Sequence, residues 1–396
     1  MSDVRYDAAV VGLGPMGAGA LRRLAKDGLR CVGVGSPEPA ALAGHEGVFA
    51  SHYDSGRITR HLDASFEWAE LARRAIADYA AIEEEGGELF HRPVGLRYAV
   101  ADPRELDAIH GVLARLGDAG RGVRELDVCD DPRVVLPDGA TVLAEARPAG
   151  HIDPRRMVRA LLTAAQRAGA TVVRDEVVAV SADGSGGGWS LRLTGGGTVA
   201  AERLLVAAGP HTDELEGLPV RPWLDVRAEA IVMGVLDDEE QDRLDGLPSL
   251  IAALAHPVYE DCYLVPPTDY PDGTVRVKLG ATRRVHQELP DAAARRAWMR
   301  GTEHTIELGD LRGLVEAVLP GVRATAWETR PCLITETPTH RPYVAEVAPG
   351  LVLAAGGNGY AAKSGLAIGA LAATLLREGR WTDAVLDADR FRVVTR

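Results

Sequence analysis

The chain has 396 residues, too many for one ordinary hydrophobic core, so we expect two domains. Hydrophobic residues make up 46% and charged residues 26%, as in globular proteins, and the net charge of -13 argues against a nucleic acid or an anionic membrane as partner. No apolar run is long enough to span a bilayer, and the first predicted strand starts so early that we expect no signal peptide and a cytoplasmic location.

The first predicted elements form a strand–helix–strand unit. Residues 6–12 are a continuous apolar run that ends at a glycine, which predicts a short buried strand. Residues 12–28 place Ala and Leu on one helical face and basic side chains on the other, and 29–35 form a second apolar strand. A crossover helix between two strands is what a parallel sheet requires.

Further α/β segments follow, separated by two mostly β stretches. A long amphipathic helix is predicted at 65–86, and α/β segments are predicted at 153–212 and 350–379. Between them, in 91–144 and 221–324, short strands alternate with Pro, Gly and Asp turns. Residues 183–191 (DGSGGGWSL) predict a hairpin loop. We therefore predict an α/β protein with one domain assembled from discontinuous pieces and a second built from the intervening segments.

A glycine motif lies between the first predicted strand and helix. Gly12, Gly14 and Gly17 form G-x-G-x-x-G, in which the glycines allow a tight turn, close approach to a pyrophosphate, and packing of helix on strand. In this context the motif predicts a bound dinucleotide. The alternative is a glycine-rich turn without a ligand.

The same motif expects an acidic residue at the end of the second strand, where it binds the adenosine ribose. That position is Gly35, with Ser36 and Glu38 as the nearest polar substitutes. A hydrogen bond to a charged group is worth about 1.5–3 kcal/mol, so its loss weakens noncovalent binding roughly tenfold or more. This counts against NAD, which is held by such contacts alone.

Six further motifs follow in order from residue 51 onward: SHYDSGRITRH (51–61), GHIDPRRMVRAL (150–161), RLLVAAGPHT (203–212), VRVKLG (275–280), CLITETP (332–338) and GGNGYAAKSG (356–365). With these motifs the sequence resembles the FAD-dependent D-amino-acid oxidase superfamily, and within it the monomeric sarcosine oxidase and N-methyltryptophan oxidase branch.

The resemblance implies a fold and an activity. It implies a discontinuous, Rossmann-like FAD-binding domain of the glutathione-reductase type (1–90, 145–220 and 325–396) and a substrate-binding domain with a mixed or antiparallel sheet and flanking helices (91–144 and 221–324). The implied reaction transfers a hydride from the α-carbon of a primary or secondary amine to flavin N5. This gives an imine, and oxygen then reoxidises the flavin to yield hydrogen peroxide.

The four cysteines (Cys31, Cys129, Cys262 and Cys332) are scattered, which predicts free thiols and no metal site. The resemblance implies that Cys332 forms a thioether to the flavin 8α-methyl group, which would offset the missing acid at Gly35. The alternative is a buried strand cysteine. The other residues implied to contact FAD are Gly12, Gly14, Pro15, Met16, Gly17, Ser36, Ser51, His52, Arg57, Ile58, Val178, Ala208, Gly209, Gly357, Asn358, Gly359 and Tyr360.

Three cations carry the implied chemistry. Lys278 lies in an alternating strand, and the resemblance implies that it assists oxygen near flavin N5; a solvent-facing lysine is the alternative. Arg57 is implied to lie over the flavin ring, and Arg60, on the same face of a predicted helical turn, to bind the substrate carboxylate through its planar fork. Each arginine taken alone could instead be a surface residue.

Three positions of the implied substrate shell depart from the sarcosine oxidases. Tyr53 stands where they tend to have histidine, Ala361 where they have lysine, with Lys363 two positions later, and Thr282 where they have histidine. The departures argue against sarcosine and favour a larger or less acidic amine, such as a cyclic imino acid or a natural-product intermediate. Tyr53 is a predicted catalytic and substrate-binding residue, Tyr360 a predicted substrate-binding one.

Several alternatives stay open at this point. His52 and His340 are either proton acceptors or ordinary loop histidines. The protein is an oxidase, a dehydrogenase of the same superfamily with another electron acceptor, or a weakly active flavin-binding subunit, and it is a monomer or a homodimer. The expected partners are a small amine and oxygen.

Overall fold

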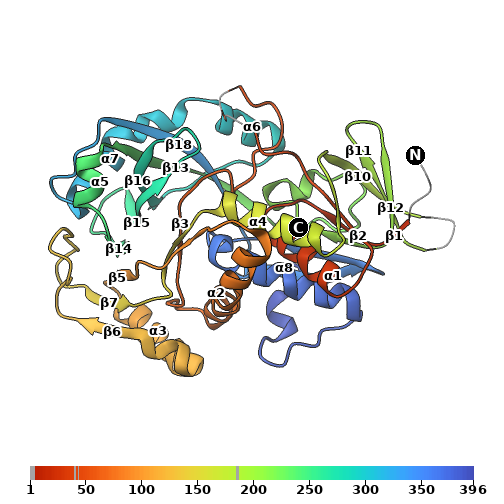
Figure 1. Cartoon of the computed structure of the whole chain (residues 1–396), viewed down its shortest axis with the longest axis horizontal. Helices are drawn as coiled ribbons and strands as arrows, with labels where there is room; N and C mark the ends of the chain where they lie inside the picture. The colour runs from red at the N-terminus through yellow and green to blue at the C-terminus, as the bar shows by residue number, and fades with distance from the viewer. Residues whose placement is uncertain (1–4, 40–41, 43, 184–186) are drawn as a thin grey trace.

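The computed structural model describes residues 5–39, 42, 44–183 and 187–396, and it has two lobes, each built on one large sheet (Figure 1). The first lobe contains an eight-stranded sheet in the order β10-β11-β12-β1-β2-β9, with β20 beside β12 and β19 beside β20. Its strands are β1 (Arg5–Val11), β2 (Cys31–Val34), β9 (Thr171–Val173), β10 (Val177–Ala182), β11 (Trp189–Leu193), β12 (Thr198–Val206), β19 (Tyr343–Ala348) and β20 (Leu351–Ala355).

Three helices lie on one face of this sheet: α1 (Pro15–Lys26), α4 (Pro154–Arg167) and α8 (Ala361–Glu378). A fourth helix, α2 (Phe66–Gly86), packs on α4 and α8. Because successive strand side chains point to opposite faces, Ala8 and Val10 of β1 join the core beneath the helices, while Ala9 and Val11 join the core on the opposite face. β1 pairs in parallel with both β2 and β12, so the predicted strand–helix–strand unit is confirmed.

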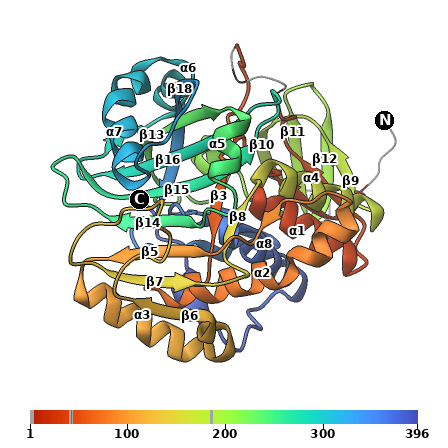
Figure 2. The same ribbon diagram turned by 60° about the vertical axis from the view of Figure 1, so that its left-hand side comes forward.

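The second lobe contains a nine-stranded sheet in the order β17-β13-β16-β15-β14-β5-β7-β6, and β18 is a further partner of β13. Figure 2 shows most of these strands side by side. Its strands are β5 (Leu96–Val100), β6 (Val123–Leu126), β7 (Thr141–Glu145), β13 (Asp225–Leu236), β14 (Ser249–Ala253), β15 (Tyr259–Asp269), β16 (Val275–Arg283), β17 (Gln287–Glu288) and β18 (Ala326–Glu336).

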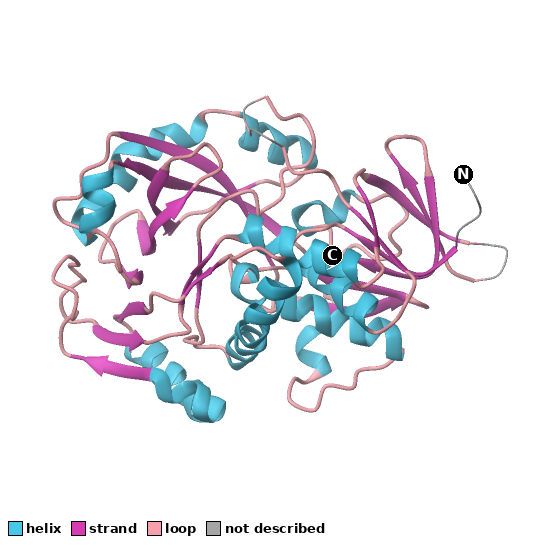
Figure 3. Cartoon of the chain, in the orientation of Figure 1, coloured by secondary structure: helices cyan, strands magenta, loops and turns pink. Residues whose placement is uncertain are grey.

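Helices lie along the outer side of this lobe (Figure 3): α3 (Pro103–Leu116), α5 (Asp238–Arg243), α6 (Ala292–Arg300) and α7 (Leu308–Val318). A small sheet, β3 (Arg57–Thr59), β8 (Gly150–Ile152) and β4 (His91–Arg92), lies between the lobes. Short 3-10 helices span Gly117–Gly122, Gly209–Glu214, Glu303–Glu307 and Ala388–Phe391. Within the described residues, no helix is both long and apolar enough to cross a membrane.

The α/β fold is confirmed, with two differences in detail. The segment of Arg57 is strand β3, paired with β8, so the predicted helical turn from Arg57 to Arg60 is wrong. β18, which the sequence assigns to the cofactor domain, pairs along its whole length with β13 of the nine-stranded sheet. Strands β10 and β11 form an antiparallel pair, as the predicted hairpin loop requires, although residues 184–186 of that loop lie outside the described residues.

Candidate active site

Two glycines at the start of α1, Gly12 and Gly17, leave no room for a side chain. Gly12 has a φ of +87°, and a Cβ there would lie 2.4 Å from the carbonyl oxygen of Ala207. A Cβ on Gly17 would lie 1.7 Å from the carbonyl oxygen of Gly12, so this glycine is needed for packing of α1 against the loop. Gly14 caps α1 without a side-chain hydrogen bond, and the first turn holds no acid, which leaves its N–H groups and positive dipole end free for an anion.

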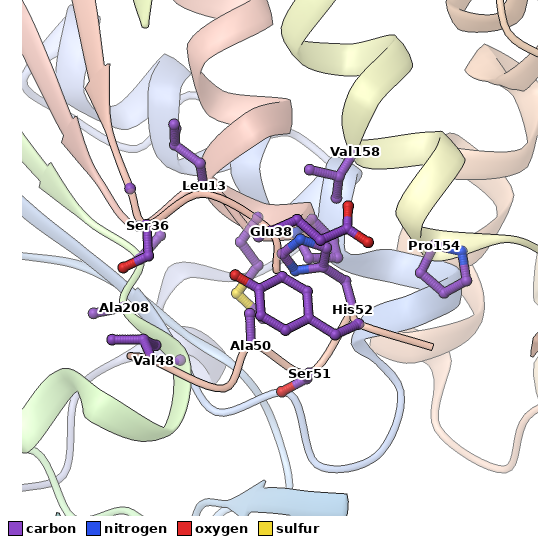
Figure 4. Close-up of a pocket in the computed structure, with 18 of the residues that line it drawn as sticks. Leu13, Ser36, Glu38, Val48, Ala50, Ser51, His52, Pro154, Val158 and Ala208 are labelled. Carbon is purple, nitrogen blue, oxygen red and sulfur yellow. The ribbon is translucent and has the colours of Figure 1, made fainter. Parts of the chain in front are cut away.

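A cavity of about 820 Å³ starts at this loop and runs along the carboxyl ends of β1 and β2. Figure 4 shows part of its wall, with Leu13 and Ser36 after the two strands, His52 from a later loop, and Pro154 and Val158 from α4. The volume is in the range of cofactor sites, and this end of a parallel sheet is where such sites form.

One wall of the cavity is rich in charged residues. It contains four arginines, Arg155, Arg156, Arg159 and Arg174, and the acids Glu38 and Asp153 pair with three of them. His52 beside them is buried, its Nδ1 has no hydrogen-bond partner, and burial together with repulsion from the arginines lowers its pKa to about 3. A neutral histidine with an unused nitrogen, next to free helix amides and arginines, suits a negatively charged dinucleotide. The cavity therefore fits the predicted cofactor.

Steric crowding at Gly35 explains why no acidic residue stands at the position expected to bind the ribose. A Cβ on Gly35 would lie 2.9 Å from atoms of Leu13, so the loop leaves no room for a side chain. Ser36 and Glu38 both line the cavity, and Glu38 forms ion pairs with Arg155 and, at 3.7 Å, with Arg159. Glu38 thus supplies a carboxylate to the cavity three residues after the expected position.

The N-terminus of α8 reaches the same cavity. Gly356, Gly357 and Gly359 line it together with Ala361 and Ala362 of the first helical turn. Tyr360 is the N-cap residue of this helix and forms no capping hydrogen bond with its side chain, and the first turn holds no acid. Asn358 does not line the cavity; its side chain donates to the carbonyl of Gly356 and accepts from the Thr337 N–H, which fixes the loop.

A buried charge cluster adjoins the cavity where the lobes meet. Lys278 on β16 is 1% exposed, and its Nζ donates to Asp54 Oδ2 at 2.6 Å and to the carbonyl of Gly56. Arg57, which lines the cavity, donates to the same carboxylate, and its Nη2 lies 3.7 Å from Cys332 Sγ. Burial, with repulsion from Arg57, lowers the pKa of Lys278 well below its ordinary value.

A second cluster surrounds Arg60. Its guanidinium is buried between the rings of Tyr98 and Tyr360, at 5.7 and 5.8 Å from their centroids. Its Nη1 lies 3.4 Å from Asp63, and its Nε has no hydrogen-bond partner. Lys363 donates to the same Asp63 carboxylate at 2.6 Å, and burial together with Arg60 lowers the pKa of this lysine to about 8. The Arg60 cluster thus retains an unused donor.

The predicted cofactor residues fall into two groups. Most of them line the cavity: Gly12, Gly14, Pro15, Met16, Ser36, Ser51, His52, Arg57, Val178, Ala208, Gly209, Cys332, Gly357 and Gly359. The others surround it without forming its wall: Gly17, Ile58, Asn358 and Tyr360.

Tyr53 is not brought to the other predicted substrate residues. It lines the cofactor cavity, its hydroxyl lies 3.3 Å from the carbonyl oxygen of Pro37, and its ring packs edge-on against His52. Burial raises its pKa to about 12. This position is near Glu38, Arg155 and Arg174, so a role for Tyr53 in substrate binding stays a prediction.

Comparison with known proteins shows the family of the chain. The family model described as "DAO: FAD dependent oxidoreductase" matches residues 7–375. The chain belongs to this family. It is therefore an FAD-dependent oxidoreductase of the kind that acts on amines and amino acids.

Individual relatives of this DAO-family protein are distant. Monomeric sarcosine oxidase of Bacillus sp. (strain B-0618) is 23% identical over 95% of this chain and 93% of its own length. NikD in its open form, described as an unusual amino acid oxidase essential for nikkomycin biosynthesis, is 21% identical with a TM-score of 0.75, over 99% of this chain and 98% of its own. Glycine oxidase from Geobacillus kaustophilus is 22% identical with a TM-score of 0.71, over 98% of each chain.

Two carboxylates in the site of this DAO-family protein were missed by the sequence analysis, and both have a signal in the sequence. Asp54 lies three residues before Arg57, and Asp63 lies three residues after Arg60. Each also binds a lysine that is distant in sequence, Lys278 or Lys363. An arginine with an acid three residues away is common on protein surfaces, so the spacing alone could not have identified these pairs.

Proposed function

We propose that the protein is an FAD-dependent oxidase of a primary or secondary amine that carries a carboxylate. The observation that carries the proposal is the buried ion pair of Lys278 and Asp54, with Arg57 on the same carboxylate and in the wall of the dinucleotide cavity. A lysine that is 1% exposed is costly to bury unless its charge is used or neutralised. Perturbed, buried charges beside a cofactor cavity are typical of active sites.

The cavity residues would hold FAD along its whole length. The free amides of α1 after Gly14 suit the pyrophosphate, and Ser36 or Glu38 lies where the ribose is expected. At the other end, the free amides of α8 would stabilise negative charge on the reduced flavin ring. When bound, FAD accepts a hydride from the α-carbon of the amine and passes the electrons to oxygen, which yields an imine and hydrogen peroxide.

The chain's own residues bind and orient the reactants. Arg60 would bind the substrate carboxylate, because its guanidinium is buried and its Nε is unpaired. Lys278 presents a positive charge where negative charge develops on oxygen, and in a buried site such a charge acts strongly. Arg57 holds its guanidinium at the cavity wall, next to Cys332.

The substrate is larger than sarcosine. Two aromatic rings, Tyr98 and Tyr360, flank the Arg60 guanidinium, and they suit a ring or another flat apolar body next to the carboxylate. Ala361 and Thr282 stand where the sarcosine oxidases have a lysine and a histidine. A cyclic imino acid or a natural-product intermediate fits both features, and NikD, with its similar fold, is described as acting in nikkomycin biosynthesis.

The flavin is held covalently through Cys332. Support comes from the position of its sulfur, which lies in the cavity wall 3.7 Å from the Arg57 guanidinium. Acid precipitation of the purified protein should leave the yellow colour in the pellet, and Cys332→Ser should release it to the supernatant. Yellow colour in the wild-type supernatant would contradict the tether.

The proposed function is tested by mixing the purified protein anaerobically with a panel of amino acids, cyclic imino acids and N-methylated amines. We expect at least one member to bleach the flavin absorbance, and admission of air to restore it with one equivalent of hydrogen peroxide. Recovery only with an artificial electron acceptor would indicate a dehydrogenase. Failure of every compound to bleach the flavin would favour a flavin-binding subunit.

A further inference from the structure

Asp54 connects three elements at the centre of the site. It is 6% exposed, and its Oδ2 accepts from Lys278 of β16 at 2.6 Å and from Arg57 of β3. Its Oδ1 accepts from the Tyr270 hydroxyl at 3.0 Å and from the Ser55 N–H at 2.9 Å. One buried carboxylate therefore fixes two cations and the turn after β15. A carboxylate bound this fully is rigid, because each of its oxygens has two donors.

Without Asp54, the surroundings of Lys278 would disfavour its protonated form. Arg57 and Arg330, on β3 and β18, repel a protonated lysine, and burial adds to their effect. His151 of β8, whose pKa burial lowers to about 3, is neutral in the working range, and the Tyr263 ring of β15 lies 5.4 Å from Nζ. Cys332 of β18 would favour the charge only as a thiolate, a form lost in a thioether. Among the described residues, Asp54 is the carboxylate that contacts Lys278 and opposes these effects.

We propose that Asp54 is the positioning residue that keeps Lys278 charged and in place for the reaction with oxygen. The inference rests on the proposed oxidase function. Asp54 acts through Lys278, whose ammonium it contacts, and the same carboxylate sets the direction of the Arg57 guanidinium.

The test measures the reaction of reduced flavin with oxygen, with the flavin reduced by light so that no substrate is needed. We expect Asp54→Asn to lower the second-order rate constant by about tenfold or more, because the lysine loses its counter-charge. The pH midpoint of that rate constant should shift downward, since Lys278 deprotonates at lower pH. Asp383→Asn, which removes a carboxylate from an ion pair with Arg74 outside the site, controls for a general loss of stability.

A double-mutant cycle separates positioning from a structural role. Lys278→Met and Asp54→Asn should be non-additive, so that the double variant reacts with oxygen about as slowly as Lys278→Met alone. The affinity of the oxidised flavin for sulfite, read from bleaching without turnover, should fall in both single variants. Additive effects, or an unchanged rate and pH profile in Asp54→Asn, would overturn the proposal.

Two further outcomes are distinguishable. If the wild-type flavin reacts with oxygen no faster than free flavin, the proposed oxidase function fails, whatever Asp54 does. If Asp54→Asn cannot be purified folded, Asp54→Glu serves. This variant keeps the negative charge, so its pH midpoint should stay at the wild-type value. A midpoint shifted by Asp54→Glu would overturn the role assigned to the charge.

Discussion

Arg60 is a buried guanidinium whose hydrogen-bonding capacity is only partly used. Its Nη1 lies 3.4 Å from Asp63, while its Nε has no hydrogen-bond partner, although the residue is 7% exposed. A buried donor without a partner costs about 1–3 kcal/mol. A ligand carboxylate would remove this cost, and the planar fork would bind it through two bonds. Lys363, the second cation of this cluster, already forms an ion pair with Asp63 at 2.6 Å, so its charge has a partner.

For Arg60→Lys we therefore expect KM for the best carboxylate-bearing substrate to rise about 10–100-fold, with kcat changed less, because an ammonium cannot form the bidentate contact. Steady-state kinetics with peroxide detection measures both constants. The matched control is the same substrate with its carboxylate esterified, for which the variant should differ little from the wild type. An equal rise in KM for acid and ester would show that Arg60 does not bind the carboxylate.

Glu229 is a buried acid on β13 whose charge opposes folding. It is 8% exposed and lies opposite Cys332 of β18 in the sheet. Burial raises its pKa to about 8, and Arg227 at 3.6 Å only partly offsets this. Since the folded pKa exceeds the unfolded value, the protonated form stabilises the fold. That stabilisation is complete below about pH 4 and is lost as the pH rises to about 8.

Glu229→Gln, which stays neutral, should stabilise the protein by about 2–4 kcal/mol at pH 9 and by much less at pH 5. Urea unfolding at both pH values measures the difference. Glu260→Gln, at an exposed neighbouring position on β15, should show no such pH dependence. If the two pH values give the same change for Glu229→Gln, the acid is ionised in the fold at pH 5.

At the scale of elements, glycines allow α1 and α8 to pack closely, and the N-termini of both helices line the cofactor cavity. A Cβ on Gly369 would lie 1.9 Å from the carbonyl oxygen of Met16, and one on Gly19 would lie 2.8 Å from Leu366. The two backbones therefore approach closely, and this contact sets the position of the helix ends that would face the cofactor.

Gly369→Ala should push these helices apart, destabilise the protein by about 1–3 kcal/mol and lower its flavin content. Thermal unfolding and the ratio of absorbance at 450 and 280 nm measure the two effects. Gly111→Ala is the control, because a Cβ at this exposed position of α3 meets nothing within 4 Å. It should be neutral or stabilise the protein by about 0.5–1 kcal/mol through helix propensity. A flavin content in Gly369→Ala equal to that of the control would contradict this account.

The sequence could predict those elements whose conformation is set by residues close by in the chain. The apolar run of β1, the glycine loop and α1 follow from neighbouring residues, and the structure confirms them as elements. By contrast, Arg57 lies in a strand because Ile152, about a hundred residues later, pairs with it. The residue spacing that predicted a helical turn carries no information on such a partner. The same holds for Asp54, whose role is visible only once β16 brings Lys278 to it.

At the scale of the whole molecule, the cofactor cavity belongs to both lobes. Gly12, Ser36 and Gly357 come from the lobe with the eight-stranded sheet, whereas Tyr270 and Cys332 come from the other lobe. Figure 1 shows the two sheets on opposite sides of the molecule, with β3 between them. A ligand in such a cavity binds the folded chain and not the unfolded one, so it stabilises both lobes together.

Flavin should therefore set the melting temperature of the whole chain, and a tether would make this effect independent of concentration. Wild-type protein with covalent flavin should keep its Tm after dialysis and dilution. In Cys332→Ser the flavin can dissociate, so each tenfold drop in free FAD, well above its Kd, should cost about 1.4 kcal/mol of stability. Calorimetry over a range of added FAD measures this, with Cys129→Ser, a cysteine outside the cavity, as the control. A wild-type Tm that falls on dialysis in step with Cys332→Ser would show that the flavin is not tethered.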